Sequence, residues 1–233
     1  MIPGSRRPVI LAYHGVGDAD DAADPRRLVV APRHLAAHIR LLRRRGYQFV
    51  TAGDLSPHGP PPPRTAVLTF DDGWLDALTT VTPMLARLGI RASFFVCPGM
   101  WGGQHPLVTG PPGRLLDEDG VRALAEAGMD VGSHAMTHRD LRGLSDAELE
   151  KELVRSRAKI ERVTGRPCRT LAHPYGLSDE RTEAAASRAG YDLALAWLPG
   201  PWRPLAAPRL PGPPRHGALR LALKLAGVRR RAP

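Results

Sequence analysis

The sequence predicts an α/β fold in which parallel strands, joined by helices, curve toward a barrel. Short apolar segments alternate with segments that carry apolar residues at helical spacing, which is typical of strand–helix–strand units. About seven such steps fit into the 233 residues, too many for a small open sheet and one short of an eightfold barrel. Titratable residues follow directly after several of the strands, where barrel folds of this kind place their active sites.

The first strand is expected at residues 9–13, an apolar VILAY run. A helix then opens at residues 31–32, because the proline there suits a first helical turn, and it ends at Gly46. One face of this helix carries apolar residues, namely Leu35, Ala36, Ile39 and Leu42. Residues 48–50 resume as a strand, and residues 56–64, with five prolines, form a loop.

The clearest strand is residues 66–70, AVLTF, which ends at two aspartates and a glycine. Apolar residues at helical spacing over residues 75–88 predict the next helix, and Pro83 inside it predicts a bend or a separated first turn. Residues 92–96 follow as a strand, and residues 98–113 form a long loop rich in glycine and proline. Loops of this length in a compact domain are commonly functional.

The second half of the chain repeats the alternation. Strands are expected at residues 130–132, 170–172 and 193–197, and helices at residues 117–127, 145–164 and 178–189. Ser145 and Glu148 have the spacing of a capping box, which fixes the start of the longest of these helices.

Residues 1–210 are expected to form the barrel domain, and residues 211–233 a basic amphipathic C-terminal tail. A helix over residues 216–230 would carry a narrow cationic stripe between its apolar residues. This stripe consists of Arg220, Lys224 and Arg231. Such a helix could lie on an anionic membrane surface, or it could dock on the barrel with a frayed basic end.

The net charge of +10 comes from the same end of the chain. From residue 193 onward there are eight basic residues and no acidic one, so basic and acidic residues are nearly equal in number over residues 1–192. Aromatic residues make up only 5% of the chain and do not interleave with the arginines. This composition argues against a nucleic-acid binder.

No apolar run reaches the roughly 20 residues that are needed to cross a bilayer. The apolar run near the start is shorter than the about 7–15 residues of a signal peptide, and no small-residue cleavage site follows it. Cys97 and Cys168 stand alone and are expected as two small buried hydrophobes without a disulfide framework. We therefore expect a cytoplasmic protein.

Four groups of polar residues follow the predicted strands. They are His14, the pair Asp71 and Asp72, the pair His134 and His138, and the HPYG segment at residues 173–176. One carboxylate and two imidazoles are typical ligands of Zn²⁺ or a similar divalent cation, with a position left open for water. Two adjacent aspartates repel each other unless a cation or a proton relieves them. The alternative is that Asp72 caps the following helix and Asp71 is solvated.

Three segments together resemble the motifs of one known family. TFDDG at residues 69–73, SHAMTH at residues 133–138 and PYG at residues 174–176 resemble those of the polysaccharide deacetylase domain (NodB homology, carbohydrate esterase family four). Their order and spacing also fit, from about residue 8 to residue 210. The resemblance implies a distorted (β/α)7 barrel.

The resemblance also implies roles for individual residues. Asp72, His134 and His138 would bind a divalent metal, Zn²⁺ foremost, with Co²⁺, Ni²⁺ or Mn²⁺ as alternatives. Asp71 would act as the general base, and the backbone N–H of Tyr175 would help to hold the oxyanion. These roles suit amide hydrolysis, because a metal polarises the carbonyl and acidifies water.

The chain departs from the family pattern in two places. Many members have an arginine where this chain has Ala172, and a late Leu-x-x-His motif that supplies the general acid, which His216 does not match. YHGV at residues 13–16 resembles instead the exopolysaccharide N-deacetylase branch, in which a histidine follows the first strand. We therefore predict His14 as the general acid, with His173 as a weaker alternative.

Substrate contacts are expected from Pro174, Tyr175 and Trp101. The other tryptophans could line a sugar platform or pack in the core: Trp74, Trp197 and Trp202. Three further histidines are expected at the surface: His34, His38 and His58.

These features predict a metal-dependent N-deacetylase that hydrolyses the acetamide of an N-acetylated amino sugar in a glycan, a glycolipid or a sugar precursor. Deformylation, or hydrolysis of another C–N amide bond, is an alternative within the family. A non-catalytic carbohydrate- or membrane-binding module is the alternative from another class, supported by the missing arginine at Ala172. The oligomeric state stays open.

Overall fold

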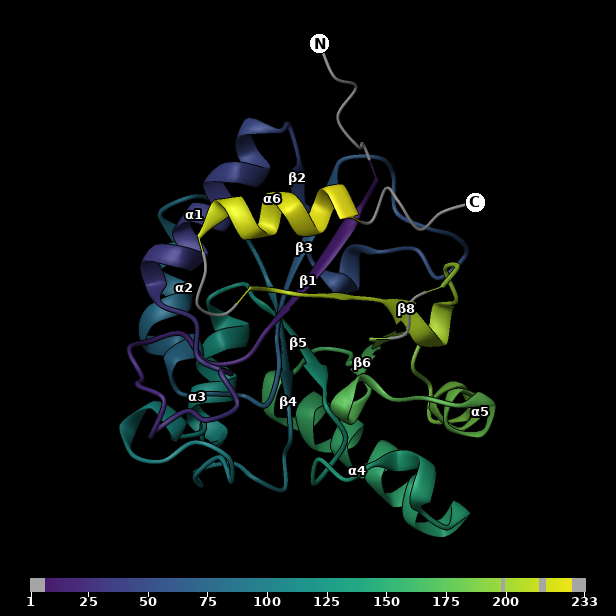
Figure 1. The fold of residues 1–233 in the computed structure, drawn as a ribbon. Helices are drawn as coiled ribbons and strands as arrows, with labels where there is room; N and C mark the ends of the chain where they lie inside the picture. Colours follow the sequence, from purple (N-terminus) through teal and green to yellow (C-terminus); the bar gives the residue numbers. More distant parts are fainter. Residues whose placement is uncertain (1–6, 198–199, 214–216, 228–233) are drawn as a thin grey trace.

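Parallel strands form one sheet that curves into a barrel, with helices packed around its outside (Figure 1). The computed structural model describes residues 7–197, 200–213 and 217–227. Within these residues the strand order is β8-β7-β6-β5-β4-β3-β1-β9, and β2 pairs with β3 outside this path. The strands are β1 Val9–Tyr13, β2 Gln48–Val50, β3 Thr65–Phe70, β4 Ser93–Val96, β5 Asp130–Ser133, β6 Thr170–Ala172, β7 Leu193–Ala196, β8 Ala207–Pro208 and β9 Leu210–Pro211.

The helices follow the strands as the alternation predicts. They are α1 Pro32–Arg44, α2 Thr82–Ala86, α3 Glu118–Glu126, α4 Asp146–Thr164, α5 Glu180–Arg188 and α6 Ala218–Gly227. The capping box of Ser145 and Glu148 opens α4, as expected. Ahead of α2, residues Ala77–Val81 form a π-helical turn, which matches the predicted irregularity because Pro83 has no N–H to donate to the preceding turn.

One short segment joins the two edges of the sheet and closes the barrel. β8 pairs with β7 through Ala207 and Leu195, while β9 pairs with β1 through Leu210 and Leu11. Arg209 is the single residue between β8 and β9, and its side chain is buried. Sequence patterns do not reveal these strands, because each has two residues and ends in a proline, which lacks a ladder N–H.

The barrel strands are apolar on both faces. Every residue of β1 and β3 is buried, as expected for parallel strands that are covered on both sides. Leu11 and Leu68 belong to the large cluster that also contains the apolar residues of the surrounding helices. Ile10 and Val67 belong to a smaller cluster with Phe95, built mainly from strand residues inside the barrel. Alternate residues of one strand therefore serve the two sides of the barrel wall.

The C-terminal helix α6 lies beside α1 on the outside of the barrel (Figure 1). Leu221 and Leu225 are buried in the main core, whereas Leu219 and Leu223 are exposed. The interpretation of a docked helix is therefore confirmed for residues 218–227. β9 crosses the expected boundary at residue 210, and Arg231 lies outside the described residues.

Other predictions about single residues can be compared with the fold. Cys97 and Cys168 are buried and free, as expected. No helix in the described part of the chain combines the length and the hydropathy needed to cross a bilayer.

The prediction that His38 lies on the surface is wrong. His38 is fully buried, and its Nδ1 shares a hydrogen bond of 3.0 Å with the hydroxyl of Tyr13. Its position explains the burial, because residue 38 falls between Leu35 and Leu42 on the apolar face of α1. A polar residue on such a face needs a partner, and the Tyr13 hydroxyl supplies it.

We expect Gly132→Ala to lower the free energy of unfolding by about 1–3 kcal/mol through overpacking of the barrel interior. An added Cβ at Gly132 would lie 2.5 Å from Cε1 of Phe95 and 2.5 Å from Oγ1 of Thr170. Urea unfolding followed by circular dichroism measures the change. Gly143→Ala is the matched control, since nothing lies within 4 Å of a Cβ at that position. Equal destabilisation by the two substitutions would contradict the packing described here.

Candidate metal centre and active site

The turn after β3 places two aspartates side by side. Asp72 and Gly73 both have positive φ, at +73° and +79°, a conformation that costs a non-glycine residue on the order of 1–2 kcal/mol. The N–H of Asp71 donates to the Tyr13 carbonyl at 2.9 Å, and the N–H of Leu116 donates to the Gly73 carbonyl at 2.8 Å. Both aspartates are buried, so the alternative of a solvated Asp71 is wrong.

The turn after β5 carries the two histidines. Ala135 and His138 have positive φ, and the turn brings the rings of His134 and His138 to 4.8 Å between their centres. Glu152 in α4 is buried and accepts hydrogen bonds from the backbone N–H groups of residues 136–137, at 2.8 and 2.9 Å. A buried carboxylate therefore fixes the turn between the histidines.

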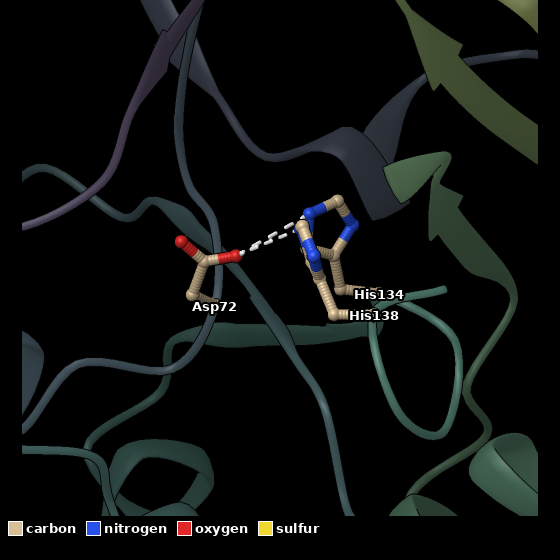
Figure 2. A group of neighbouring side chains, drawn as sticks. All are labelled: Asp72, His134 and His138. Atoms are coloured by element: carbon tan, nitrogen blue, oxygen red, sulfur yellow. Dashed lines mark ion pairs between the residues drawn. The ribbon is translucent and has the colours of Figure 1, made fainter. Parts of the chain in front are cut away.

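Asp72, His134 and His138 converge on one point (Figure 2). Oδ1 of Asp72 lies 3.5 Å from Nε2 of His134 and 3.4 Å from Nε2 of His138. In a tetrahedral zinc site with bonds of about 2.1 Å, neighbouring ligand atoms lie about 3.4 Å apart. Oδ1 is also buried without a hydrogen-bond partner in the described part of the chain. These three residues therefore fit a divalent cation.

The protonation of His134 agrees with this fit. Its Nδ1 lies 2.6 Å from the carbonyl oxygen of Ala172, which can only accept, so Nδ1 carries the proton and Nε2 offers a lone pair. Burial lowers the pKa of His134 to about 4, so the ring is neutral at pH 7. A lone pair that faces the carboxylate of Asp72 is repelled by it unless a cation lies between them.

Two N–H groups hold the other oxygen of Asp72. Nε1 of Trp74 and Nε2 of His105 each lie 3.2 Å from Oδ2. Burial alone would raise the pKa of Asp72, but the N–H of His105 beside Oδ2 lowers it overall. Asp72 is therefore ionised at neutral pH, as a ligating carboxylate must be.

Arg209 neutralises Asp71 inside the barrel. Its Nη1 donates to Oδ1 of Asp71 at 2.7 Å and to Oγ1 of Thr69 at 3.1 Å. Burial alone would raise the pKa of Asp71, but the charge of the Arg209 guanidinium lowers it overall. The centre thus contains a guanidinium although the third motif is preceded by Ala172, and it comes from the segment that closes the barrel.

His14, Trp197 and Tyr175 lie near this cluster. The ring of His14 meets Trp197 edge to face at 6.1 Å, and the ring of His138 meets Tyr175 in the same way at 4.6 Å. Tyr175 is 49% exposed and Trp197 is 37% exposed, so both rings are open to a ligand. Pro174 is buried in the same turn, where Tyr175 has a φ of +59°.

Trp101 and His173 have other surroundings. Nζ of Lys159 lies 4.5 Å from the centre of the Trp101 ring and donates to the Pro98 carbonyl at 2.8 Å, so Trp101 packs against α4. His173 is buried, and its Nε2 donates to the Leu205 carbonyl at 2.9 Å. Burial lowers the pKa of His173 to about 4, so the imidazole is neutral at pH 7.

Four residues that hold the site have no motif of their own: Trp74, His105, Glu152 and Arg209. Arg209 lies 138 positions from Asp71 in the sequence, and Glu152 lies on a helix whose many charged residues are typical of a solvated face. The missing arginine at Ala172 is the one feature of the sequence that points to a guanidinium elsewhere in the chain.

Comparisons with known proteins agree with the motifs. A model of the polysaccharide deacetylase family matches residues 58–194. YxkH of Bacillus subtilis (strain 168), whose name places it among the polysaccharide deacetylases, is 25% identical over 195 residues, which are 82% of this chain and 64% of that protein. The chitin deacetylase of Pestalotiopsis sp is 25% identical over 135 residues, which are 58% of this chain and 42% of that protein. The chain thus spans less than two thirds of the length of these relatives.

The Streptococcus pyogenes deacetylase PplD, whose structure was solved in complex with acetate, has the same fold. The two chains superpose with a TM-score of 0.78 at 21% identity, over 95% of this chain and 99% of PplD. This likeness confirms the predicted barrel.

We expect Arg209→Met to lower the free energy of unfolding at pH 7 by about 3–5 kcal/mol, because it leaves the buried carboxylate of Asp71 unpaired. Without the guanidinium the pKa of Asp71 rises, so the deficit relative to the unchanged chain shrinks as the pH falls and the carboxyl becomes neutral. Urea unfolding at pH 7 and at lower pH measures both effects.

Two further variants distinguish the loss of this ion pair from a general loss of stability. Adding Asp71→Asn to Arg209→Met removes the unpaired charge, so the double variant loses less stability than the two single losses combined. Arg169→Met is the control for loss of an arginine, because its exposed pair with Asp192 spans 3.9 Å and contributes at most about 1 kcal/mol. Additive losses in the double variant would contradict the pairing.

Proposed function

The chain belongs to the polysaccharide deacetylase family, and on that premise we propose that it hydrolyses the acetamide of an N-acetylated amino sugar. A divalent cation, Zn²⁺ foremost, would be held by Asp72, His134 and His138. One observation carries the proposal: a buried, unpartnered carboxylate oxygen and two imidazole nitrogens converge beside a second buried carboxylate, that of Asp71.

The chemistry divides between the cation and the side chains. When bound, a divalent cation polarises a carbonyl oxygen and makes water a stronger acid. Asp71 is the general base: Arg209 keeps it ionised through Oδ1, and Oδ2 is left to take a proton from the attacking water. The C–O bond that forms and the C–N bond that breaks yield acetate and a free amine.

The leaving amine needs a proton, and His14 is the candidate that supplies it. His14 follows β1, and its ring meets the exposed ring of Trp197 edge to face, which supports a position beside the reacting bond. His173, the alternative, is neutral and engaged with the Leu205 carbonyl, which does not favour it. His14 is therefore the better-supported candidate for the general acid.

The third motif orients the substrate. The backbone N–H of Tyr175 stabilises the oxyanion, and Pro174 holds the turn that presents it. The exposed rings of Tyr175 and Trp197 offer apolar faces to a sugar ring. Trp101 packs against Lys159, so a contact with substrate at that residue has less support. An acetyl group is favoured over a formyl group by the chitin deacetylase relative.

The C-terminal helix supports a second interaction, with an anionic membrane surface. Leu221 and Leu225 anchor α6 on the barrel, and this leaves Leu219 and Leu223 exposed to 76% and 63%. The sequence from residue 193 onward carries eight basic and no acidic residues. On such a surface the exposed leucines would enter the boundary of the acyl chains, and the cationic side chains beside them would attract the anionic headgroups.

The test of the proposed reaction is acetate release by the Zn²⁺- or Co²⁺-loaded protein from a panel of N-acetylated sugars. The panel contains free oligosaccharides, nucleotide sugars and lipid-linked sugars, together with N-formylated counterparts. Release of acetate from one class identifies the substrate class. Release of formate alone would replace the deacetylase proposal with a deformylase. No release from any compound by the metal-loaded protein would contradict the proposal and favour a binding module.

We expect Asp71→Asn to keep the bound metal but to lose at least about 100-fold in turnover, since it removes the general base. Asp72→Ala removes a ligand and is expected to lose the metal itself. Metal analysis after dialysis, together with acetate release, distinguishes the two outcomes. Asp119→Asn is the control, because this carboxylate is 88% exposed on α3. Full metal content in Asp72→Ala would contradict the assigned site.

For the tail, we expect the double substitution Leu219→Ser and Leu223→Ser to weaken binding to vesicles that contain anionic lipid by about tenfold, because two apolar side chains no longer enter the membrane. Vesicle sedimentation of the full chain measures the effect. Leu107→Ser is the matched control, since Leu107 is also exposed, at 44%, but lies in the loop after β4 and not in α6. Equal binding by the double variant and the unchanged chain would contradict a role for α6.

A further inference from the structure

The two oxygens of Asp72 have opposite surroundings. Oδ1 is buried, has no hydrogen-bond partner in the described residues and faces the imidazoles of His134 and His138. Oδ2 accepts a hydrogen bond from Nε1 of Trp74 at 3.2 Å, and Nε2 of His105 lies at the same distance from it. The carboxylate is therefore divided into one oxygen free to ligate and one oxygen that is already engaged.

His105 is held so that it can only donate to Asp72. The backbone N–H of Leu107 donates to its Nδ1 at 3.2 Å, so Nδ1 is the acceptor and Nε2 carries the hydrogen. The imidazole is 4% exposed and stacks on Trp74, with ring centres 4.6 Å apart and planes 25° apart. The two donor rings thus support each other beneath the carboxylate.

The loop that carries His105 is fastened to the backbone beside Asp72. Within residues 98–116, the N–H of His105 donates to the Gly113 carbonyl at 2.7 Å, and the N–H of Leu116 donates to the Gly73 carbonyl at 2.8 Å. The side-chain amide of Gln104 ties the tip of the loop by donating to two of its carbonyls, at 2.8 and 2.9 Å. The position of His105 is therefore built into the fold.

We propose that His105, together with Trp74, clamps Asp72 so that Oδ1 is its only ligating oxygen. The inference rests on the proposed metal site. A carboxylate can bind a cation through one or both oxygens, and the two N–H groups occupy the lone pairs that Oδ2 would need to join. One-oxygen binding leaves coordination positions open for water and substrate, as a catalytic site requires. His105 is a positioning residue: it acts on the cation through Asp72.

The test uses the purified full chain loaded with Co²⁺, whose visible absorption weakens as the number of ligands rises. His105→Phe keeps a ring to stack on Trp74 but removes the N–H, so Oδ2 becomes free to ligate. We expect a several-fold weaker visible absorption and, in chelator competition, a metal affinity altered by about 10- to 100-fold. His105→Gln restores an N–H donor near the position of Nε2, so its spectrum is expected to return toward that of the unchanged chain.

The matched control is Gln104→Ala, which loosens the same loop without touching Asp72. An unchanged Co²⁺ spectrum and affinity in His105→Phe would overturn the clamp alone, since the metal site itself would still be present. The same change in Gln104→Ala as in His105→Phe would also overturn it, because loop packing would then explain the effect. No Co²⁺ uptake by the unchanged chain would contradict the proposed function as well. Circular dichroism of every variant confirms that it is folded before its spectrum is compared.

Discussion

The buried ion pair between Arg209 and Asp71 links the closure of the barrel to its chemistry. Arg209 is the one residue between β8 and β9, which pair with opposite edges of the sheet, and its guanidinium lies 2.7 Å from the carboxylate of Asp71, directly after β3. Either charge alone would be costly in this interior, whereas together they are mutually neutralised. The same contact holds Asp71 ionised. If β8 and β9 did not pair with the two edges of the sheet, Arg209 would no longer lie beside Asp71, and the candidate base would lose the charge that keeps it ionised.

The candidate metal ligands follow a similar logic, because each is oriented by a group from another part of the fold. The carbonyl of Ala172 in β6 fixes the proton of His134, and Glu152 in α4 fixes the turn that leads to His138. The loop after β4 supplies His105 to Asp72. Support of this kind orients the ligands before a cation binds, so little reorganisation opposes binding. The strained positive φ of Asp72 and His138 is maintained by these same contacts.

Local patterns were sufficient to predict the alternating elements and the residues that stand after the strands. The cluster of Asp72, His134 and His138 follows from such positions, since β4 pairs in parallel with both β3 and β5, and the ends of these strands meet at one edge. The supporting residues follow no local pattern: Arg209 reaches Asp71 from a two-proline segment, and His105 reaches Asp72 from a loop without periodicity. Contacts of this kind depend on how the chain closes in three dimensions. The burial of His38, by contrast, can be predicted from a local pattern. His38 lies at the helical spacing of the buried apolar residues of α1, so its position predicts burial although the residue is polar.

The central claim is that one carboxylate oxygen and two neutral imidazoles bind a single divalent cation beside Asp71. The most direct measurement is X-ray diffraction from crystals of the protein grown with Zn²⁺, recorded on both sides of the zinc absorption edge. The account predicts one strong anomalous peak within bonding distance of Oδ1 of Asp72 and Nε2 of His134 and His138. Ordered side chains with no peak between them, or a peak only at another place in the molecule, would contradict it.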